Sequence, residues 1–196
     1  LYVTPLNLDP LAPALPVSSP ATYAADLAAA TGRFYTQGMP EDTASLKAGV
    51  LTPSEFLDQA RIAVGENERQ YRDVLEHATD GFLFYYFGHV DQVSHMMWRA
   101  MDPQHPAYDP KVDPKYSAVV EHLYEEMDGI VGRTLPRLRG DDLLVIMSDH
   151  GFASWRRAFN VNSWLRDNGY LKIRQRPTGG GDASFDDIDW SGTRAY

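Results

Sequence analysis

Two pairs of carboxylate and imidazole side chains are the part of this sequence best suited to chemistry. They are Asp91 with His95, four residues apart, and Asp149 with His150, which are adjacent. Residues four apart lie on one face of a helix, so Asp91 and His95 could share a cation there. Asp149 and His150 could cooperate only beyond the end of a strand, and Gly151 gives the backbone freedom for that turn. Carboxylate and imidazole ligands without thiolate suit Zn²⁺ or Mn²⁺ better than Mg²⁺ or Fe²⁺.

A short apolar run stands directly before each pair. Residues 82–87 read Phe-Leu-Phe-Tyr-Tyr-Phe, and residues 143–147 read Leu-Leu-Val-Ile-Met. Short runs without polar alternation are typical of strands buried on both faces of a parallel sheet. The carboxyl ends of parallel strands meet at one edge of an open α/β sheet, where ligand sites form. The sequence therefore predicts that the two pairs lie close together in space.

Helix signals flank both predicted strands. Thr52-Pro53-Ser54-Glu55 is a capping box with proline at the first helical position, and it predicts a helix over 53–78. Asp113-Pro114 opens a second long helical stripe that ends near Gly140. A strand, a long helix and a second strand form a βαβ unit with parallel strands. Shorter elements are predicted as helices from Ser19-Pro20 to Gly32, around 41–47 and over 161–168, and as a strand over 170–174.

These elements predict an α/β fold with a mainly parallel sheet flanked by helices. We assign residues 1–196 to part of a single catalytic domain. Within it, residues 1–52 form an irregular and helical opening segment, 53–175 the α/β core, and 176–196 a loop and the start of a further strand. The first residues have neither an initiator Met nor the layout of a signal peptide, so we expect the chain to begin inside a longer protein.

The composition fits a folded acidic protein and excludes several kinds of site. Of 196 residues, 43% are hydrophobic, which is enough for a sizeable core. The net charge of −9 argues against a nucleic-acid groove; a cation-attracting site and a solvated acidic surface explain it equally well. The lack of cysteine excludes disulfides and thiolate sites. No apolar run approaches the ~20 residues of a membrane span, and neither compartment nor oligomeric state is indicated.

Ordinary explanations exist for each candidate residue taken alone. An Asp-x-x-x-His pair in a helix is usually on a solvated surface, and an Asp after a strand often caps the next helix. The combination of both pairs is harder to explain by chance. His89 either contacts a ligand or substrate, or is a polar residue at the strand exit. Arg156 and Arg157 either bind a phosphate in bidentate fashion or lie exposed in a loop.

Both motifs resemble those of one enzyme family. Residues 85–95, Tyr-Tyr-Phe-Gly-His-Val-Asp-Gln-Val-Ser-His, resemble the Asp-x-x-x-His segment of type I phosphodiesterases and nucleotide pyrophosphatases. Residues 145–152, Val-Ile-Met-Ser-Asp-His-Gly-Phe, are similar to the Asp-His-Gly signature of the same alkaline phosphatase superfamily. The resemblance is good from Asp80 to Tyr170 and looser toward both ends. It implies an alkaline-phosphatase-like core, present here in part, in which the first pair binds one divalent metal and the second pair the other.

The resemblance implies a metal-dependent phosphohydrolase that acts on a small phosphate ester with two divalent ions, Zn or Mn. In such enzymes one metal lowers the pKa of a hydroxyl nucleophile, and both metals clamp the attacking and leaving oxygens. The family's upstream Asp, its Thr or Ser nucleophile and its last His have no match here, so we assign no catalytic nucleophile and expect this chain alone to be inactive. Two alternatives stay open: a metal-dependent phosphomutase of the cofactor-independent phosphoglycerate mutase type, and a non-catalytic binding domain that kept the fold.

Overall fold

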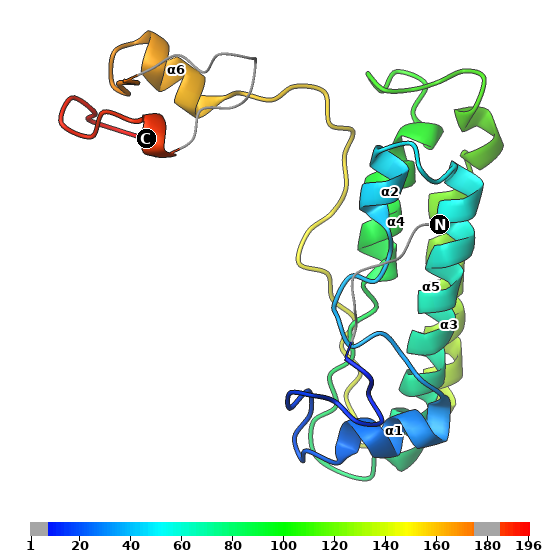
Figure 1. Ribbon diagram of the computed structural model, residues 1–196. Coiled ribbons are helices and arrows are strands. Elements are labelled where there is room, and N and C mark those ends of the chain that lie inside the picture. The colour runs from blue at the N-terminus through cyan, green and yellow to red at the C-terminus, as the bar shows by residue number, and fades with distance from the viewer. Residues whose placement is uncertain (1–7, 175–184) are drawn as a thin grey trace. The chain divides into compact units, whose positions relative to one another are not determined.

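The computed structural model describes residues 8–174 and 185–196. The chain divides into two compact units, Leu1–Ser154 and Trp155–Tyr196. The described residues form helices joined by irregular segments (Figure 1). Within this part of the chain, no helix combines the length and apolar character needed to cross a membrane. The assignment of the whole chain to a single catalytic domain stays a prediction.

Helices build the first unit. In chain order they are α1 (Tyr23–Thr31), α2 (Thr43–Lys47), α3 (Pro53–His77), α4 (His89–Met101), the 3₁₀ helix η1 (Asp113–Tyr116), α5 (Val119–Thr134) and the 3₁₀ helix η2 (Leu135–Arg137). The three long helices α3, α4 and α5 run side by side, and α4 contacts both of the others (Figure 1). Helix α4 is therefore fixed on two sides.

The predicted parallel sheet is wrong for the part of the chain that the structure describes. No strand occurs in residues 8–174 and 185–196, and their one bridge is an isolated antiparallel pairing of Ile173 with Ile188. The run 82–87 is irregular, and Phe82 is 91% exposed. The run 143–147 is also irregular, and Leu143 is 86% exposed. A strand needs a partner for its backbone hydrogen bonds, and no described segment pairs with either run. Where an α/β core was expected over 53–175, the described residues 53–174 form helices and irregular segments.

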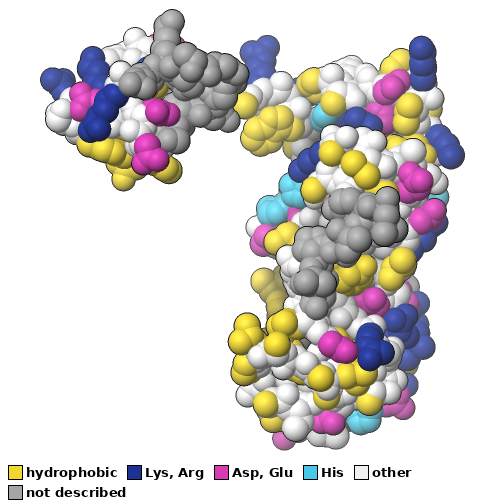
Figure 2. Space-filling view, in the orientation of Figure 1, with side chains coloured by type: hydrophobic (Ala, Val, Ile, Leu, Met, Phe, Trp, Pro, Cys, Tyr) yellow, Lys and Arg dark blue, Asp and Glu magenta, His cyan; other side chains and the backbone are white. Residues whose placement is uncertain are grey.

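Apolar side chains consequently reach the surface of the first unit. Figure 2 shows them gathered near the end of this unit where α1 lies. Phe84 is 64% exposed and Tyr86 is 62% exposed, although both belong to a run whose composition is typical of a protein interior. Their exposure follows from the unpaired backbone of that run.

Helix boundaries set by local chemistry were predicted well. The Thr52 hydroxyl accepts a hydrogen bond from the backbone N–H of Glu55 at 3.3 Å, and the Glu55 carboxylate accepts one from the N–H of Thr52 at 2.8 Å. These two bonds satisfy backbone donors that a helix start leaves unpaired. Helix α1 ends at Gly32 as predicted, with a φ of 91° that favours glycine. Its start differs, because α1 begins at Tyr23 with Thr22 at the N-cap rather than at Ser19-Pro20. The Ser18 hydroxyl accepts a hydrogen bond from the N–H of Ala24 in the first turn at 3.0 Å.

The second long helix is shorter than predicted. In place of one helix from Asp113 to near Gly140, the structure has η1, α5 and η2 in succession. Helix α5 ends at Thr134, just before Pro136, whose backbone has no N–H to donate to the preceding turn. The chain continues for one tighter turn as η2.

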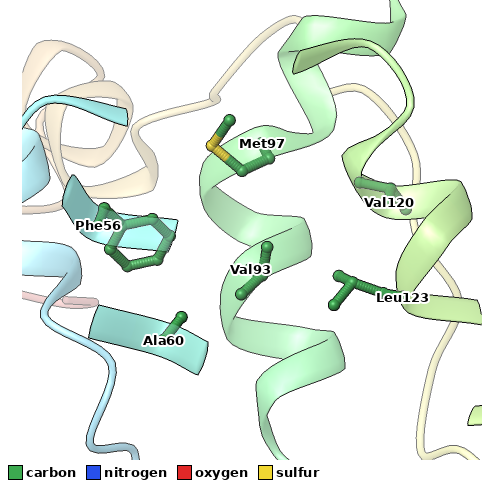
Figure 3. Packing of buried hydrophobic residues seen from close by; sticks show 6 residues of the cluster. All are labelled: Phe56, Ala60, Val93, Met97, Val120 and Leu123. Atoms are coloured by element: carbon green, nitrogen blue, oxygen red, sulfur yellow. The ribbon is translucent and has the colours of Figure 1, made fainter. Parts of the chain in front are cut away.

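The core of the first unit lies where α3, α4 and α5 meet (Figure 3). Its buried members are Phe56 and Ala60 on α3, Val93 and Met97 on α4, and Val120 and Leu123 on α5. Val93 and Met97 are one turn apart, so they form one apolar face of α4. Packing of this face sets the orientation of the helix and turns its opposite face, with Asp91 and His95, away from the core.

The second unit contains α6 (Val161–Asp167) and the 3₁₀ helix η3 (Phe185–Asp187). The Asn160 side chain caps α6 by accepting a hydrogen bond from the N–H of Ser163 at 2.8 Å, so the predicted short helix is confirmed. The predicted strand over 170–174 is wrong, since its only pairing is the Ile173 bridge among the described residues. Residues 175–184, which include most of the predicted loop, lie outside the described residues.

Candidate functional site

Asp91 is the centre of a group of polar side chains in the first unit. Its Oδ1 atom lies 3.3 Å from Nε2 of His95 and 3.6 Å from Nε2 of His150. Nε2 of His150 in turn lies 3.6 Å from Oδ2 of Asp149. The structure therefore brings both predicted pairs together. It does so without the parallel sheet from which their proximity was inferred.

The first pair owes its geometry to α4. This helix begins at His89, so Asp91 and His95 lie one turn apart on the same face, as the four-residue spacing predicts. The side chain of Asp91 is 25% exposed and that of His95 is 56% exposed. The imidazole of His95 is therefore accessible from the side of α4 opposite its apolar face, whereas the carboxylate of Asp91 is more covered.

The loop that carries Asp149 and His150 is held against α4 by an aromatic contact. The Phe152 ring stacks on the Trp98 indole with centroids 5.2 Å apart and meets the His95 ring edge-on at 4.9 Å. Two residues further on, the Ser154 hydroxyl donates a hydrogen bond to the carboxylate of Asp102 at the end of α4. Trp98 also packs against the core cluster of the first unit, so it connects this loop to the core.

The donors fit a divalent metal in chemistry but not as a complete ligand set. Oδ1 of Asp91 is buried and has no hydrogen-bond partner, which leaves it available to a cation. Donors on a tetrahedral zinc ion stand roughly 3.4 Å apart, given metal–ligand bonds of about 2.0–2.2 Å. The distances from Asp91 to His95 and His150, 3.3 and 3.6 Å, are close to this value. Nevertheless, no three His, Asp or Glu residues of the described ranges are arranged to hold a metal ion.

Glu41 and Tyr86 are neighbours of this group that sequence reasoning missed. Burial raises the pKa of Glu41, and the nearby carboxylate of Asp91 raises it further. Burial also raises the pKa of the Tyr86 hydroxyl, as do the carboxylates of Asp91, Asp149 and Glu41. A negative charge is disfavoured away from water, which is the larger effect for both groups, and also beside other negative charges. The surroundings of Asp91 thus have a negative electrostatic potential.

His89 is a buried residue at the first position of α4 rather than a polar residue at the exit of a strand. Its side chain is 0% exposed, and neither ring nitrogen has a hydrogen-bond partner. Burial lowers its pKa to about 4, because the charged imidazolium is disfavoured away from water. The ring is therefore neutral at pH 7, with one nitrogen able to donate and the other able to accept. Its predicted contact with substrate stays a prediction.

Arg156 and Arg157 lie outside the first unit. They are among the first residues of the second unit, and both side chains are exposed. Their predicted role in binding phosphate stays a prediction.

A comparison with protein-family models defines the class of protein. The model for type I phosphodiesterase / nucleotide pyrophosphatase matches residues 21–189, a range that includes both Asp/His pairs. This is a class of phosphoric ester hydrolases that is generally metal-dependent. The chain belongs to the type I phosphodiesterase / nucleotide pyrophosphatase family. No match was found among curated proteins or among solved structures.

Proposed function

We propose that the chain provides metal ligands for a phosphodiesterase of the nucleotide pyrophosphatase type, with Asp91 and His95 as one ligand pair and Asp149 and His150 as the other. The observation that carries the proposal is the convergence of both imidazoles on Oδ1 of Asp91, at 3.3 and 3.6 Å. Zn²⁺ or Mn²⁺ suits this mixture of carboxylate and imidazole donors. The substrate would be a small phosphate ester.

The side chains around Asp91 would have different roles in the site. Oδ1 of Asp91 lies near one Nε2 atom from α4 and one from the loop, so a bound ion could contact Asp91 together with His95 or His150. The Phe152 ring would hold the two imidazoles in place, because it contacts both of them edge-on. A bound divalent ion would supply Lewis acidity toward a phosphoryl oxygen and lower the pKa of a hydroxyl.

We further propose that this chain alone turns over phosphate esters slowly or not at all. A catalytic zinc site has about three protein ligands and one open position, whereas each metal would receive only one of the two proposed pairs, and no three described His, Asp or Glu residues are arranged to hold a metal ion. The same observation favours the second candidate function, a binding domain that holds a cation without catalysis. No described residue favours the phosphomutase alternative.

Zinc binding by the purified chain tests the ligand assignment. We expect Zn²⁺ to bind after removal of other metals with a chelator, and we expect Asp91→Asn to weaken binding by about tenfold or more. The matched control is Asp73→Asn on α3, because Asp73 and His77 form another Asp-x-x-x-His pair, with Oδ2 and Nδ1 3.7 Å apart. If both variants lose affinity equally, zinc binding is a general property of surface pairs and the assignment is wrong.

Hydrolysis of a chromogenic aryl phosphodiester tests the catalytic part of the proposal. We expect little turnover by this chain with Zn²⁺ or Mn²⁺ present, and none after chelation. Turnover at rates typical of enzymes would contradict the argument from paired donors. Zinc affinity without any turnover, in every longer form of the protein as well, would favour the non-catalytic binding domain.

A further inference from the structure

A pocket of about 470 Å³ lies in the first unit beside the Asp91 group. Its walls come from α1, the segment 34–41, α3 and the residues at the start of α4. Pockets for small organic ligands measure about 300–1,000 Å³, so this pocket is of their size. It is much larger than the space that a single metal ion occupies. A ligand of a different kind from the proposed metal is therefore indicated.

Two buried side chains in the wall of the pocket carry unpaired polar atoms. Glu41 is 5% exposed, and its Oε2 atom has no hydrogen-bond partner. His89 is 0% exposed, and both of its ring nitrogens lack a partner. Both residues line the pocket. Buried polar groups in folded proteins are nearly always paired, so a ligand that pairs with these atoms would complete the site.

The charge of the pocket wall selects the sign of the ligand. The described lining includes the carboxylates of Glu41 and Glu66 and has no Lys or Arg. Glu66 is partly compensated, because it accepts a hydrogen bond from the N–H of Tyr35 at 3.0 Å. Oε2 of Glu41 has no hydrogen-bond partner. With carboxylates and no described cationic side chain in its wall, the pocket attracts positive charge and repels anions.

Aromatic rings make up the other distinctive part of the wall. Tyr23, Phe34, Tyr35 and Tyr86 all line the pocket. The face of an aromatic ring attracts cations, and rings combined with carboxylates are the usual surroundings of bound ammonium groups. The wall thus offers apolar surface to a hydrocarbon and negative charge to a cationic head group.

We propose that this pocket binds a small organic cation, with its ammonium group toward Glu41 and its hydrocarbon part against the aromatic rings. His89 would hydrogen-bond to a further polar group of the same ligand. This proposal does not rest on the proposed metal ligands, because Glu41, His89 and the rings are separate from them. The ligand class is set by one buried carboxylate, an aromatic wall and the volume of the pocket.

A series of three probes with the same ring tests the selection of charge. The probes are 2-phenylethylammonium, 2-phenylethanol and 3-phenylpropanoate, and ligand-observed NMR measures their binding to the full chain in the presence of a metal chelator. We expect the ammonium to bind about tenfold or more tightly than the alcohol, and the carboxylate not to bind, since a charged hydrogen bond adds about this factor. Equal affinities for ammonium and alcohol, or binding of the carboxylate, would overturn the proposal.

Substitutions then locate the binding site. Glu41→Gln should weaken ammonium binding by about tenfold or more and leave alcohol binding unchanged, because the amide keeps the shape of the side chain and loses its charge. Glu125→Gln, at an exposed position of α5, is the matched control and should change neither affinity. Unchanged ammonium binding in Glu41→Gln would refute the proposal.

A second variant keeps the test valid if Glu41→Gln fails to fold. Tyr86 is 62% exposed, so Tyr86→Ala should preserve the fold while removing one ring of the wall. We expect this variant to weaken ammonium binding by about two- to fivefold, with far-UV circular dichroism as the check on folding. No loss in this variant would count against the proposal. Zinc affinity is measured separately on the same protein preparations. If the chain binds zinc but does not bind the ammonium probe, the pocket proposal is refuted and the proposed metal ligands are not.

Discussion

The packing of α3 against α4 determines where Asp91 and His95 lie, and Phe56 is the side chain that tests it. Phe56 is 0% exposed and belongs to the cluster with Val93 and Met97 of α4. Truncation of a buried phenylalanine to alanine removes its apolar contacts and leaves a cavity, at a cost of about 3–5 kcal/mol. We therefore expect Phe56→Ala to lower the free energy of unfolding by that amount. At about 2–4 °C per kcal/mol, the midpoint temperature should fall by about 6–20 °C.

Urea unfolding followed by far-UV circular dichroism measures this loss. The matched control is Ile62→Ala, which truncates a large apolar residue of the same helix that is 56% exposed. Its effect should stay within about 0.5 kcal/mol, as for most surface substitutions. A loss of less than about 1 kcal/mol in Phe56→Ala, or equal losses in the two variants, would refute the packing of α3 on α4. At temperatures near the unfolding midpoint of Phe56→Ala, this variant should also bind zinc more weakly, because part of it is unfolded.

Three further outcomes follow from individual side chains. Thr52→Ala removes half of the capping box and should cost about 1 kcal/mol in urea unfolding. Burial raises the pKa of Glu41 above 4.5, so the Glu41 carboxyl binds its proton more tightly in the folded state than in the unfolded state. The free energy of unfolding should therefore decrease as pH rises through the folded pKa. Glu41→Gln should make this decrease smaller. The pKa of His89 is instead lowered from 6.5 to about 4, so stability should be lost as pH falls between these values. The loss amounts to about 3 kcal/mol, and His89→Phe should remove it; a loss of equal size in that variant would show that another group titrates.

Local signals allowed accurate prediction of several helix ends. The capping box at Thr52 and the glycine at position 32 act through bonds and dihedral angles within one turn, which the sequence displays directly. The end of α5 was placed too late, because the apolar stripe was followed past Pro136 although proline interrupts the backbone bonding of a helix. Where the decisive contacts are local, a single sequence is sufficient.

The sheet could not be predicted in the same way. The runs 82–87 and 143–147 have the composition of strands, but strand formation depends on partners distant in sequence. The polar pairs that follow them nevertheless meet at Asp91, through α4 on one side and the Phe152 contact on the other. The two pairs were therefore inferred correctly to lie close together. The reason given, a shared edge of a parallel sheet, is wrong for the described residues.

Glu41 and Tyr86 belong to the surroundings of Asp91 for reasons that no sequence pattern displays. Glu41 lies before the first residue of α2, fifty positions ahead of Asp91, and it approaches Asp91 only through the packing of the first unit. Tyr86 is part of a run that was interpreted as a buried strand, and its exposure places it at the wall of the pocket. Glu41 is a candidate ligand residue because its side chain is buried and one carboxylate oxygen has no hydrogen-bond partner. Only the folded structure shows this.

The stacking of Trp98 on Phe152 gives the first unit an optical reporter of its own. The other tryptophans of the chain, Trp155, Trp164 and Trp190, all lie in the second unit, so replacing them with phenylalanine leaves one indole. That indole is three residues from His95 in α4 and touches the ring that follows the Asp-His-Gly turn. Its fluorescence intensity and emission wavelength should therefore respond when the loop undocks or when a cation draws the imidazoles together. Movement of the loop is then measurable in solution without any attached dye.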